Sequence, residues 1–251
     1  MPRTLSTRVS PAPIYLPLVV AIGAQLLISA FNLDRLVADA LFSLEGKHWL
    51  LRDHWLFSEV MHTGGRRISE AFLGLICLAW LSSAYIKGLR PWRRALGYLV
   101  FAPLTATLLV SSLKQVTGVE CPWNLSVYGG DQPYIPLVQA LFQYGDGACF
   151  PAGHASAGYA WVALYFAALE LKPVWKWRCL GGALLLGVLF GVTQQLRGAH
   201  FLSHDLWSLI ICWYASALLA RVMLCRRIET GEQRSANGFQ LVKQTESTGG
   251  R

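Results

Sequence analysis

The chain has 251 residues, of which 54% are hydrophobic and only 14% are charged, against about 25% charged in an average soluble domain. So little polar surface excludes an ordinary soluble globule and favours a protein embedded in a membrane. The net charge of +8 does not gather into a basic patch with interleaved aromatic residues, so we expect no nucleic-acid partner.

Long apolar runs predict an all-α fold, a polytopic membrane protein built as a bundle of six transmembrane helices. A helix needs about 20 mostly apolar residues to cross the hydrocarbon core. The first run follows two arginines, as in a signal peptide, but it is long for one and lacks a good cleavage site, so we interpret it as a span. The six runs lie near 13–33, 68–86, 95–113, 153–170, 180–197 and 206–225.

The distribution of Lys and Arg predicts the orientation in the membrane. Basic residues are dense in 87–94 (KGLRPWRR) and in 171–178 (LKPVWKWR), and positively charged loops stay in the cytoplasm. We therefore expect a multi-pass protein of the bacterial inner membrane with both termini cytoplasmic. In this topology residues 1–12 form a cytoplasmic lead, residues 13–228 form the membrane domain, and residues 229–251 form a disordered cytoplasmic tail.

The first outside segment, residues 34–67, contains two tryptophans, Trp49 and Trp55. Tryptophan favours the boundary between lipid and water. The segment therefore predicts an amphipathic helix that lies in the membrane interface.

Two of the six cysteines, Cys121 and Cys149, lie in the longest outside loop, residues 114–152. Disulfides persist only in oxidising compartments, and this loop would face one. A bridge between them is one hypothesis and two free thiols are the other, because the sequence does not give the distance between their Cα atoms.

Ionisable residues at the ends of spans are costly, so each is a candidate functional group. On the expected topology they gather on the outside face at the end of the third span, at the start of the fourth, and between the fifth and sixth. They are Lys114, His154, Arg197, His200, His204 and Asp205.

This set of residues limits the chemistry. Two histidines can divide a reaction between a nucleophile and a general acid, and a lysine, an arginine and the amides of a Gly-containing turn can hold a phosphate. His200 and His204 are four residues apart, but the H-E-x-x-H arrangement of a zinc site is missing. We therefore expect no metal and no other cofactor.

The motifs resemble those of the type-2 phosphatidic acid phosphatase superfamily, whose signature is K-x6-R-P, then P-S-G-H, then S-R-x5-H-x3-D. The segments CPW and RGAHF also match a bacterial subgroup of membrane-associated members. The matching segments in this chain are Lys114-x6-Cys121-Pro122, then Pro151-Ala152-Gly153-His154, then His200 with His204 and Asp205.

The resemblance implies a metal-independent lipid phosphatase that acts at the periplasmic face on a lipid of the outer leaflet. His200 would be the nucleophile that forms a phosphohistidine, and His154 would protonate the leaving oxygen. Lys114 and the amide of Gly153 would bind the phosphate. Undecaprenyl pyrophosphate, lipid A phosphate, phosphatidic acid and phosphatidylglycerol phosphate are all candidate substrates, and the oligomeric state stays open.

The chain departs from the family signature at several positions. The residues that differ are Cys121 and Gln194 in place of arginines, Ala152 in place of serine, and His204 in place of aspartate, with Asp205 one position late. Either His204 or Asp205 would therefore orient His200.

Other arginines are candidates to replace the two that are missing. Arg197 lies three residues from Gln194, nearly one helical turn, so it can point to the same region. Arg66 and Arg67 at the outer start of the second span are further candidates. The histidines of the first outside segment, His48, His54 and His62, are expected to be surface or packing residues.

Three alternatives to the hydrolase remain. One is a phosphotransferase that passes the phosphate to a second lipid. Another is a degenerate member that binds lipid headgroups without turnover, although such a binder would not need both His154 and His200. The third is an unrelated transporter, which would place polar residues near the middle of the bilayer rather than at one face.

Overall fold

The computed structural model describes residues 12–143 and 145–224; the expected cytoplasmic lead, apart from Ala12, and the expected tail lie outside these ranges. The described residues form helices and no strand. The longer ones are α1 (Ala12–Ala30), α2 (Leu33–Leu44), α3 (Gly65–Ser82), α4 (Arg93–Val116), α7 (Ala163–Leu171), α8 (Lys176–Leu196) and α9 (Leu202–Met223). The shorter ones are a π-helix, η1 (Leu56–Gly64), the helices α5 (Leu137–Ala140) and α6 (Gly153–Tyr159), and the 3₁₀ turns η2 (Lys87–Trp92), η3 (Pro122–Asn124), η4 (Ser126–Tyr128), η5 (Ala160–Val162) and η6 (Pro173–Trp175).

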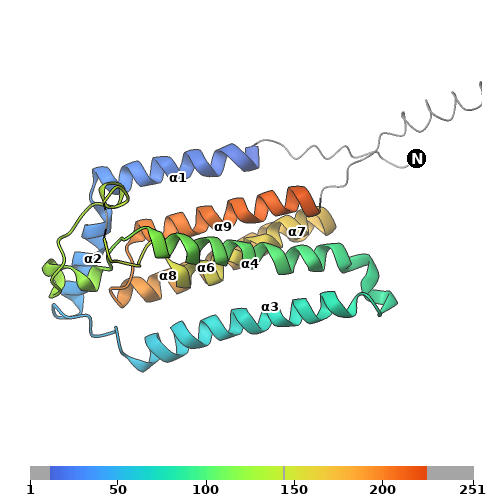
Figure 1. Ribbon diagram of the computed structural model, residues 1–251, viewed down its shortest axis with the longest axis horizontal. Helices are drawn as coiled ribbons and strands as arrows, with labels where there is room; N and C mark the ends of the chain where they lie inside the picture. Colours follow the sequence, from blue (N-terminus) through green and yellow to red (C-terminus); the bar gives the residue numbers. More distant parts are fainter. Residues whose placement is uncertain (1–11, 144, 225–251) are drawn as a thin grey trace, which may run out of the picture.

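Apart from α2, the longer helices run along the longest axis of the molecule, and α6 and α7 join through η5 into one further rod (Figure 1). Helix α4 packs against α9, and α6 packs against both α8 and α9. Helix α2 and the loop that follows α4 lie together at one end of this bundle (Figure 1). We call this end the head of the bundle.

Close contact between α6 and α8 depends on two glycines. A Cβ atom at Gly187 would lie 2.0 Å from Cδ1 of Tyr159, and a Cβ atom at Gly158 would lie 2.6 Å from the Cα of Gly187. Small residues at such a crossing let two helix backbones approach closely, which is a common way to pack helices in membranes. The crossing holds α6 in place against the middle of α8.

Three helical stretches of the described residues are long and apolar enough to cross a membrane: Lys87–Val116, Pro173–Leu196 and Leu202–Met223. A fourth candidate is the pair Tyr15–Ala30 and Leu33–Leu44, which is bent by 61°. Helices of this length and apolar character indicate a membrane protein.

A helix coincides with each of the six predicted runs, but the structure supports three or four candidate spans rather than six. Helix α3 has only 18 residues, so a stretch of spanning length within it has to include Arg66, Arg67 and Glu70. The run at 153–170 is divided by η5 into helices of seven and nine residues. The charged residues of α3 and the break between α6 and α7 therefore distinguish these two segments from the continuous apolar helices.

The expected interfacial helix of residues 34–67 lies earlier than its tryptophans. Amphipathic α2 ends at Leu44, and Trp49 follows in a loop, where its ring packs 5.2 Å from that of Phe42 and 5.5 Å from that of Tyr128. Trp55, by contrast, is exposed. Trp49 is therefore a packing residue of the head.

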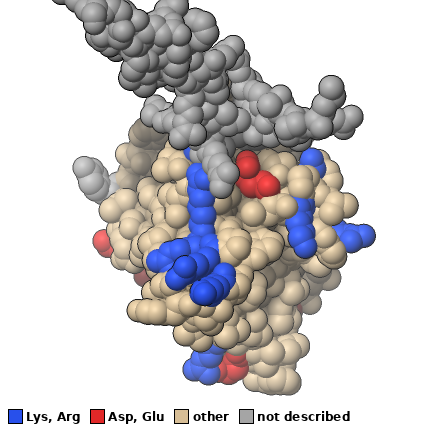
Figure 2. All heavy atoms as spheres, turned by 90° about the vertical axis from the view of Figure 1, so that its right-hand side faces the viewer, with Lys and Arg blue, Asp and Glu red and all other residues tan. Residues whose placement is uncertain are grey.

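The opposite end of the bundle carries much of the positive charge. Figure 2 looks onto this end, where Lys and Arg side chains gather over the turns between neighbouring helices. The segment from α3 to α4 and the first turn of α8 supply basic residues there, including Arg90 and Arg178. The two basic segments that we expect in the cytoplasm, residues 87–94 and 171–178, therefore lie at the same end.

A buried carboxylate ties α2 to the start of α9. One oxygen of Asp34 accepts a hydrogen bond from the backbone N–H of Ser203 at 2.8 Å, and the other accepts from its hydroxyl at 2.6 Å. Asp34 and Ser203 are both buried. This pairing satisfies an N–H at the beginning of α9, which has no partner inside the helix, and fixes α2 across the head.

We expect Asp34→Ala to lower the free energy of unfolding by about 1–3 kcal/mol, because the Ser203 N–H and hydroxyl would stay buried without an acceptor. Asp34→Asn should retain most of the stability, since its amide can pair with both groups. Thermal unfolding in detergent measures the difference, with Asp131→Ala as the exposed control. Equal midpoints for Asp34→Ala and the wild type would show that the tie does not contribute.

Candidate active site

The head brings together candidate residues from three distant parts of the chain. Lys114 lies in the last turn of α4, Gly153 and His154 begin α6, and His200 and His204 flank the start of α9. The three sequence motifs therefore meet at the head, where α4 ends and where α6 and α9 begin (Figure 1).

His200 is buried, with 6% of its surface exposed, and its neighbours engage one ring nitrogen. Its Nδ1 lies 3.4 Å from Nδ1 of His204, and the backbone of Cys149 is a hydrogen-bond partner of both rings. A neutral His200 that donates in the contact with His204 carries its proton on Nδ1. In that tautomer Nε2 of His200 keeps its lone pair.

The surroundings of His200 favour its neutral form. Burial lowers the pKa of His200 well below its usual value of 6.5, and His204 and Lys114 lower it further through their positive charges. The hydrogen bond with the Cys149 backbone acts in the opposite direction but is a smaller effect. The ring is therefore uncharged at neutral pH, as a nucleophile requires.

His154 is held by three contacts. Its Nε2 lies 3.2 Å from the carbonyl oxygen of Met61, its ring centroid lies 4.6 Å from that of His62, and the centroid of Phe190 lies at the same distance. Because a carbonyl accepts from an N–H, the Met61 contact places a proton on Nε2 of His154. The ring is thus fixed in orientation as well as in tautomer.

A cavity of about 580 Å³ opens beside His154, between α3, α4 and α6. Lys114 lines it, and a Cβ atom at Gly153 would lie 3.9 Å from Cδ of this lysine. Apolar side chains, among them Leu104 and Leu108, continue its wall along α4. The cavity therefore joins a cationic, histidine-bearing end to an apolar side.

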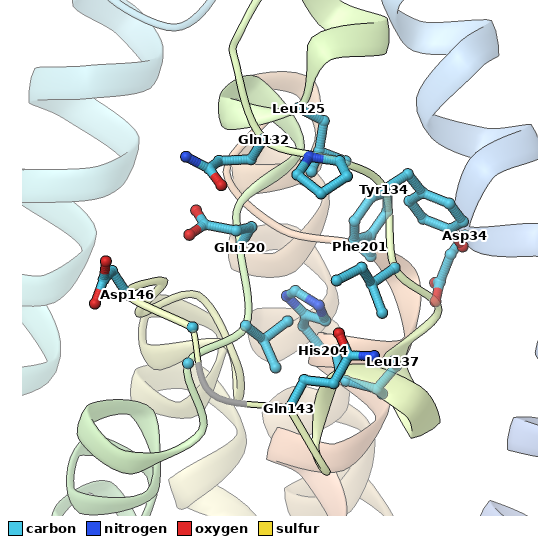
Figure 3. Close-up of a pocket in the computed structure, with 16 residues that line it drawn as sticks. Asp34, Glu120, Leu125, Gln132, Tyr134, Leu137, Gln143, Asp146, Phe201 and His204 are labelled. Atoms are coloured by element: carbon cyan, nitrogen blue, oxygen red, sulfur yellow. The ribbon is translucent and has the colours of Figure 1, made fainter.

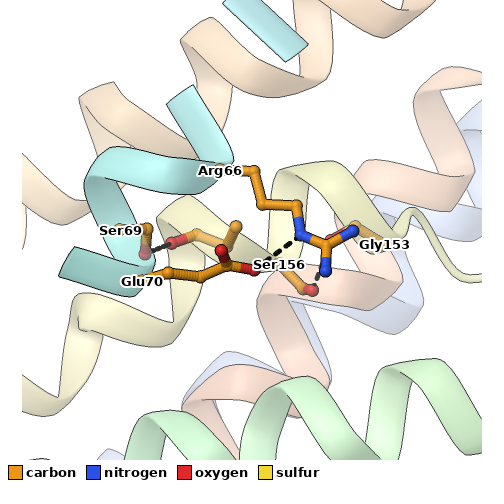
Figure 4. A network of polar contacts seen from close by, with 6 residues as sticks. Arg66, Ser69, Glu70, Gly153 and Ser156 are labelled. Atoms are coloured by element: carbon orange, nitrogen blue, oxygen red, sulfur yellow. Dashed lines mark hydrogen bonds and ion pairs between the residues drawn. The ribbon is translucent and has the colours of Figure 1, made fainter. Parts of the chain in front are cut away.

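Arg66 lies at the rim of this cavity, and its charge is already paired. Its Nε donates to Oε1 of Glu70 at 2.7 Å, with both side chains largely exposed (Figure 4). Below it, the Ser69 hydroxyl donates to the carbonyl of Ala157 at 2.9 Å and accepts from Nε1 of Trp161 at 2.8 Å, which joins α3 to the rod that begins with His154.

Arg67 is exposed and is not among the residues that line the cavity. Arg197 contacts the position at which the family signature has an arginine: its Nη1 donates to Oε1 of Gln194 at 3.2 Å, and its Nε donates to the carbonyl of Arg52 at 2.7 Å. The second side-chain group of Gln194, its Nε2, is buried without a hydrogen-bond partner. Arg197 is thus the arginine that the structure brings to this region.

Asp205 points to a neighbour other than His200. Its Oδ2 accepts from Nε2 of Gln195 at 2.6 Å, and a Cβ atom at Gly191 would lie 2.4 Å from the same oxygen. The carboxylate therefore connects α9 to α8. Of the two residues considered to orient His200, His204 is the one whose ring reaches it.

The loop between Lys114 and His154 folds back onto the site. Cys121 and Cys149 are joined by a disulfide with their Cα atoms 5.2 Å apart, and the N–H of Cys149 donates to the carbonyl of Val119 at 2.9 Å. The Trp123 N–H donates to the carbonyl of Gly198 at 2.9 Å. The disulfide loop thus fixes the Cys149 backbone against the two buried histidines.

A second cavity, of about 290 Å³, lies on the outer side of His204 (Figure 3). Three carboxylates line this cavity: that of Asp34 in α2, and those of Glu120 and Asp146 in the disulfide loop. Within residues 12–143 and 145–224, no group of three or more His, Cys, Asp or Glu residues is arranged to hold a metal ion.

The sequence did not predict the part that several residues play at the site. Met61 and Cys149 act through backbone groups, and Phe190 resembles any other apolar residue of a span. His62, which was expected on the surface or in packing, is half-buried and lines the cavity beside His154. Its position at the outer end of a predicted span was the available signal.

The PAP2 superfamily model matches residues 95–227, which is more than half of the chain and contains Lys114, His154 and His200. No curated protein and no solved structure matches the chain. The match begins in α4, so η1 and α3 lie outside it.

We expect the disulfide to protect two thiols from modification. When the unreduced protein is unfolded and treated with a thiol reagent, Cys121 and Cys149 should stay unlabelled and should react only after reduction. Cys77 and Cys179, which are free, are internal controls in the same mass-spectrometric experiment. Labelling of both Cys121 and Cys149 before reduction would contradict the bridge.

The lowered pKa of His200 predicts a dependence of stability on pH. Between the lowered pKa of the folded state and about 6.5, the unfolded chain binds a proton that the folded chain does not, so stability rises with pH there. The contribution of neutral His200 is present above about pH 6.5 and is lost as the pH falls below it. The unfolding midpoint should therefore fall less between about pH 7.5 and pH 5.5 in His200→Gln than in the wild type; equal falls would refute this contribution.

Proposed function

The chain belongs to the PAP2 superfamily, whose members are phosphatases, and we propose that it hydrolyses a phosphate monoester or pyrophosphate of a membrane lipid through a phosphohistidine intermediate. The observation that carries the proposal is the meeting of Lys114, His154 and His200 at the head, although they come from separate segments. The hydrogen-bonded Nδ1 of His200 leaves Nε2 for attack on phosphorus.

The reaction has two steps. Nε2 of His200 forms a bond to phosphorus as the bond to the lipid oxygen breaks, and His154 gives a proton to that oxygen. Water then attacks the phosphohistidine and gives its proton to the now neutral His154. Phosphate leaves, and both histidines regain their starting states.

Lys114 is the proposed partner of the phosphate charge, because its side chain lies beside Gly153 in the same cavity as His154. The Gly153 amide and Arg197 are further proposed phosphate ligands, and Arg66 is a proposed ligand at the rim. His204, together with the Cys149 backbone, is the proposed orienting group for His200 in place of the family's aspartate. Asp205 would act indirectly, by connecting α8 and α9.

Two further features support a lipid substrate at the outer face. Apolar side chains of α4 continue the wall of the cavity away from His154, as an acyl or polyprenyl chain would require. The head lies opposite the basic end shown in Figure 2, and by the positive-inside rule this arrangement supports a periplasmic site and cytoplasmic termini.

The first test is phosphate release by detergent-purified protein from a panel of phospholipid phosphates and polyprenyl pyrophosphates, with EDTA present throughout. We expect His200→Ala to lower release at least about 1,000-fold, because it removes the nucleophile. His48→Ala, an exposed histidine of the first outside segment, is the matched control and should behave as the wild type.

Release that is unchanged in His200→Ala would refute the nucleophile assignment. Release that EDTA removes and zinc restores would refute a metal-independent reaction. Wild-type protein that releases no phosphate from any lipid, but moves labelled phosphate to a second lipid, would be a phosphotransferase. If neither occurs, the hydrolase proposal fails and a headgroup-binding protein takes its place.

A further inference from the structure

The π-helix η1 packs against the proposed general acid, although it lies outside the region that the superfamily model matches. It is nine residues long and continues directly into α3. π-helical turns are rare and occur often at functional sites. Two consecutive residues of this turn, Met61 and His62, both contact His154, one through its carbonyl and the other through its ring.

The ring of His154 is sandwiched between two other rings. His62 lies on one side with an interplanar angle of 38°, and Phe190 contacts it with an angle of 32°. The Phe190 ring has room because the residue after η1 is glycine: a Cβ atom at Gly65 would lie 2.7 Å from Cε1 of Phe190. The sandwich is thus built jointly by η1, α6 and α8.

Of the two flanking rings, only His62 can exchange protons. It lines the same cavity as His154 and Lys114, so it faces the position at which the phosphate would lie. The charged and titratable groups around it come from every neighbouring segment: Glu59 of η1, Arg66 of α3, Lys114 of α4, His154 of α6 and Arg197 after α8.

These neighbours keep His62 largely uncharged. Burial lowers the pKa of His62, and Arg197, Arg66 and Lys114 lower it further, while Glu59 raises it by a smaller amount. Two imidazole rings in contact also disfavour a double positive charge, because each proton repels the other. The two histidines therefore titrate as a coupled pair, in which the first proton makes the second harder to add.

We propose that His62 is a positioning residue for the general acid: it holds the His154 ring against Phe190 and competes with it for a single shared proton. This inference rests on the proposed function, in which His154 protonates the leaving oxygen. Met61 fixes Nε2 of His154, and the contact with His62 sets the tilt of the ring. A general acid misplaced by a fraction of an ångström loses much of its effect, so the ring contact bears directly on the rate.

Two substitutions separate positioning from proton competition. His62→Ala removes the ring, so kcat should fall about 10- to 100-fold with a smaller change in KM. His62→Phe keeps a ring of similar size but cannot titrate. It should restore most of kcat and should move the alkaline limb of the pH–rate profile to higher pH by about 0.5–1 unit, because His154 no longer shares its proton. His48→Phe is the control for a histidine lost from the same outside segment.

A measurement that needs no turnover accompanies the kinetics. In ¹⁵N-histidine-labelled protein, the ring signals of His62 report its protonation as a function of pH. His154→Phe removes the competing ring, so the pH at which His62 titrates should rise. Because coupling is reciprocal, this shift tests the pair even without substrate.

The outcomes distinguish this inference from the proposed function. Three results together support it. His62→Ala is slow, His62→Phe restores the rate and displaces the alkaline limb, and His154→Phe shifts the titration of His62. An unchanged rate in His62→Ala, or an unchanged pH profile in His62→Phe together with an unchanged His62 titration, would overturn it. A shifted titration in protein that releases no phosphate would retain the pair and reject the phosphatase.

Discussion

A polar group buried without a hydrogen-bond partner costs about 1–3 kcal/mol, and this cost constrains the head, where the helices meet. Asp34 of α2 accepts a hydrogen bond from Ser203 of α9, and Gln195 of α8 donates one to Asp205 of α9. His200 is satisfied by the second buried histidine and by the backbone of the disulfide loop. The bonds that stabilise the head are therefore also the bonds that orient the proposed nucleophile.

The departures from the family signature fall at positions where the structure offers a neighbour with related chemistry. Gln194 replaces an arginine, and the guanidinium of Arg197 contacts its side-chain oxygen. His204 replaces an aspartate, and its ring lies against His200. Cys121 replaces the other arginine, and here the exchange is of a different kind, since a cation gives way to a covalent link with the segment before His154. These positions therefore carry less positive charge than the signature predicts.

Hydropathy identified where the helices lie and which end of the bundle carries the polar residues, because both are local properties of the chain. It did not separate α3 and the α6–α7 rod from the uninterrupted apolar helices, since charges at one end and a single 3₁₀ turn barely change a local average. The tie between Asp34 and Ser203 spans 169 residues, and no local pattern marks it. The contact of His62 with His154 was missed for the same reason: it depends on how a π-helical turn rotates one side chain toward a distant helix.

The disulfide closes residues 121–149 into a covalent ring that contains exposed residues of the head, including Phe142 at 87% exposure. A protease that cut a peptide bond inside this ring would leave the two pieces of the chain attached through sulfur. The halves that carry Lys114 and His154 would then stay tethered, and the cut would be invisible on a gel run without a reducing agent. Proteolytic nicking of the loop and loss of the protein are therefore separate events for this chain.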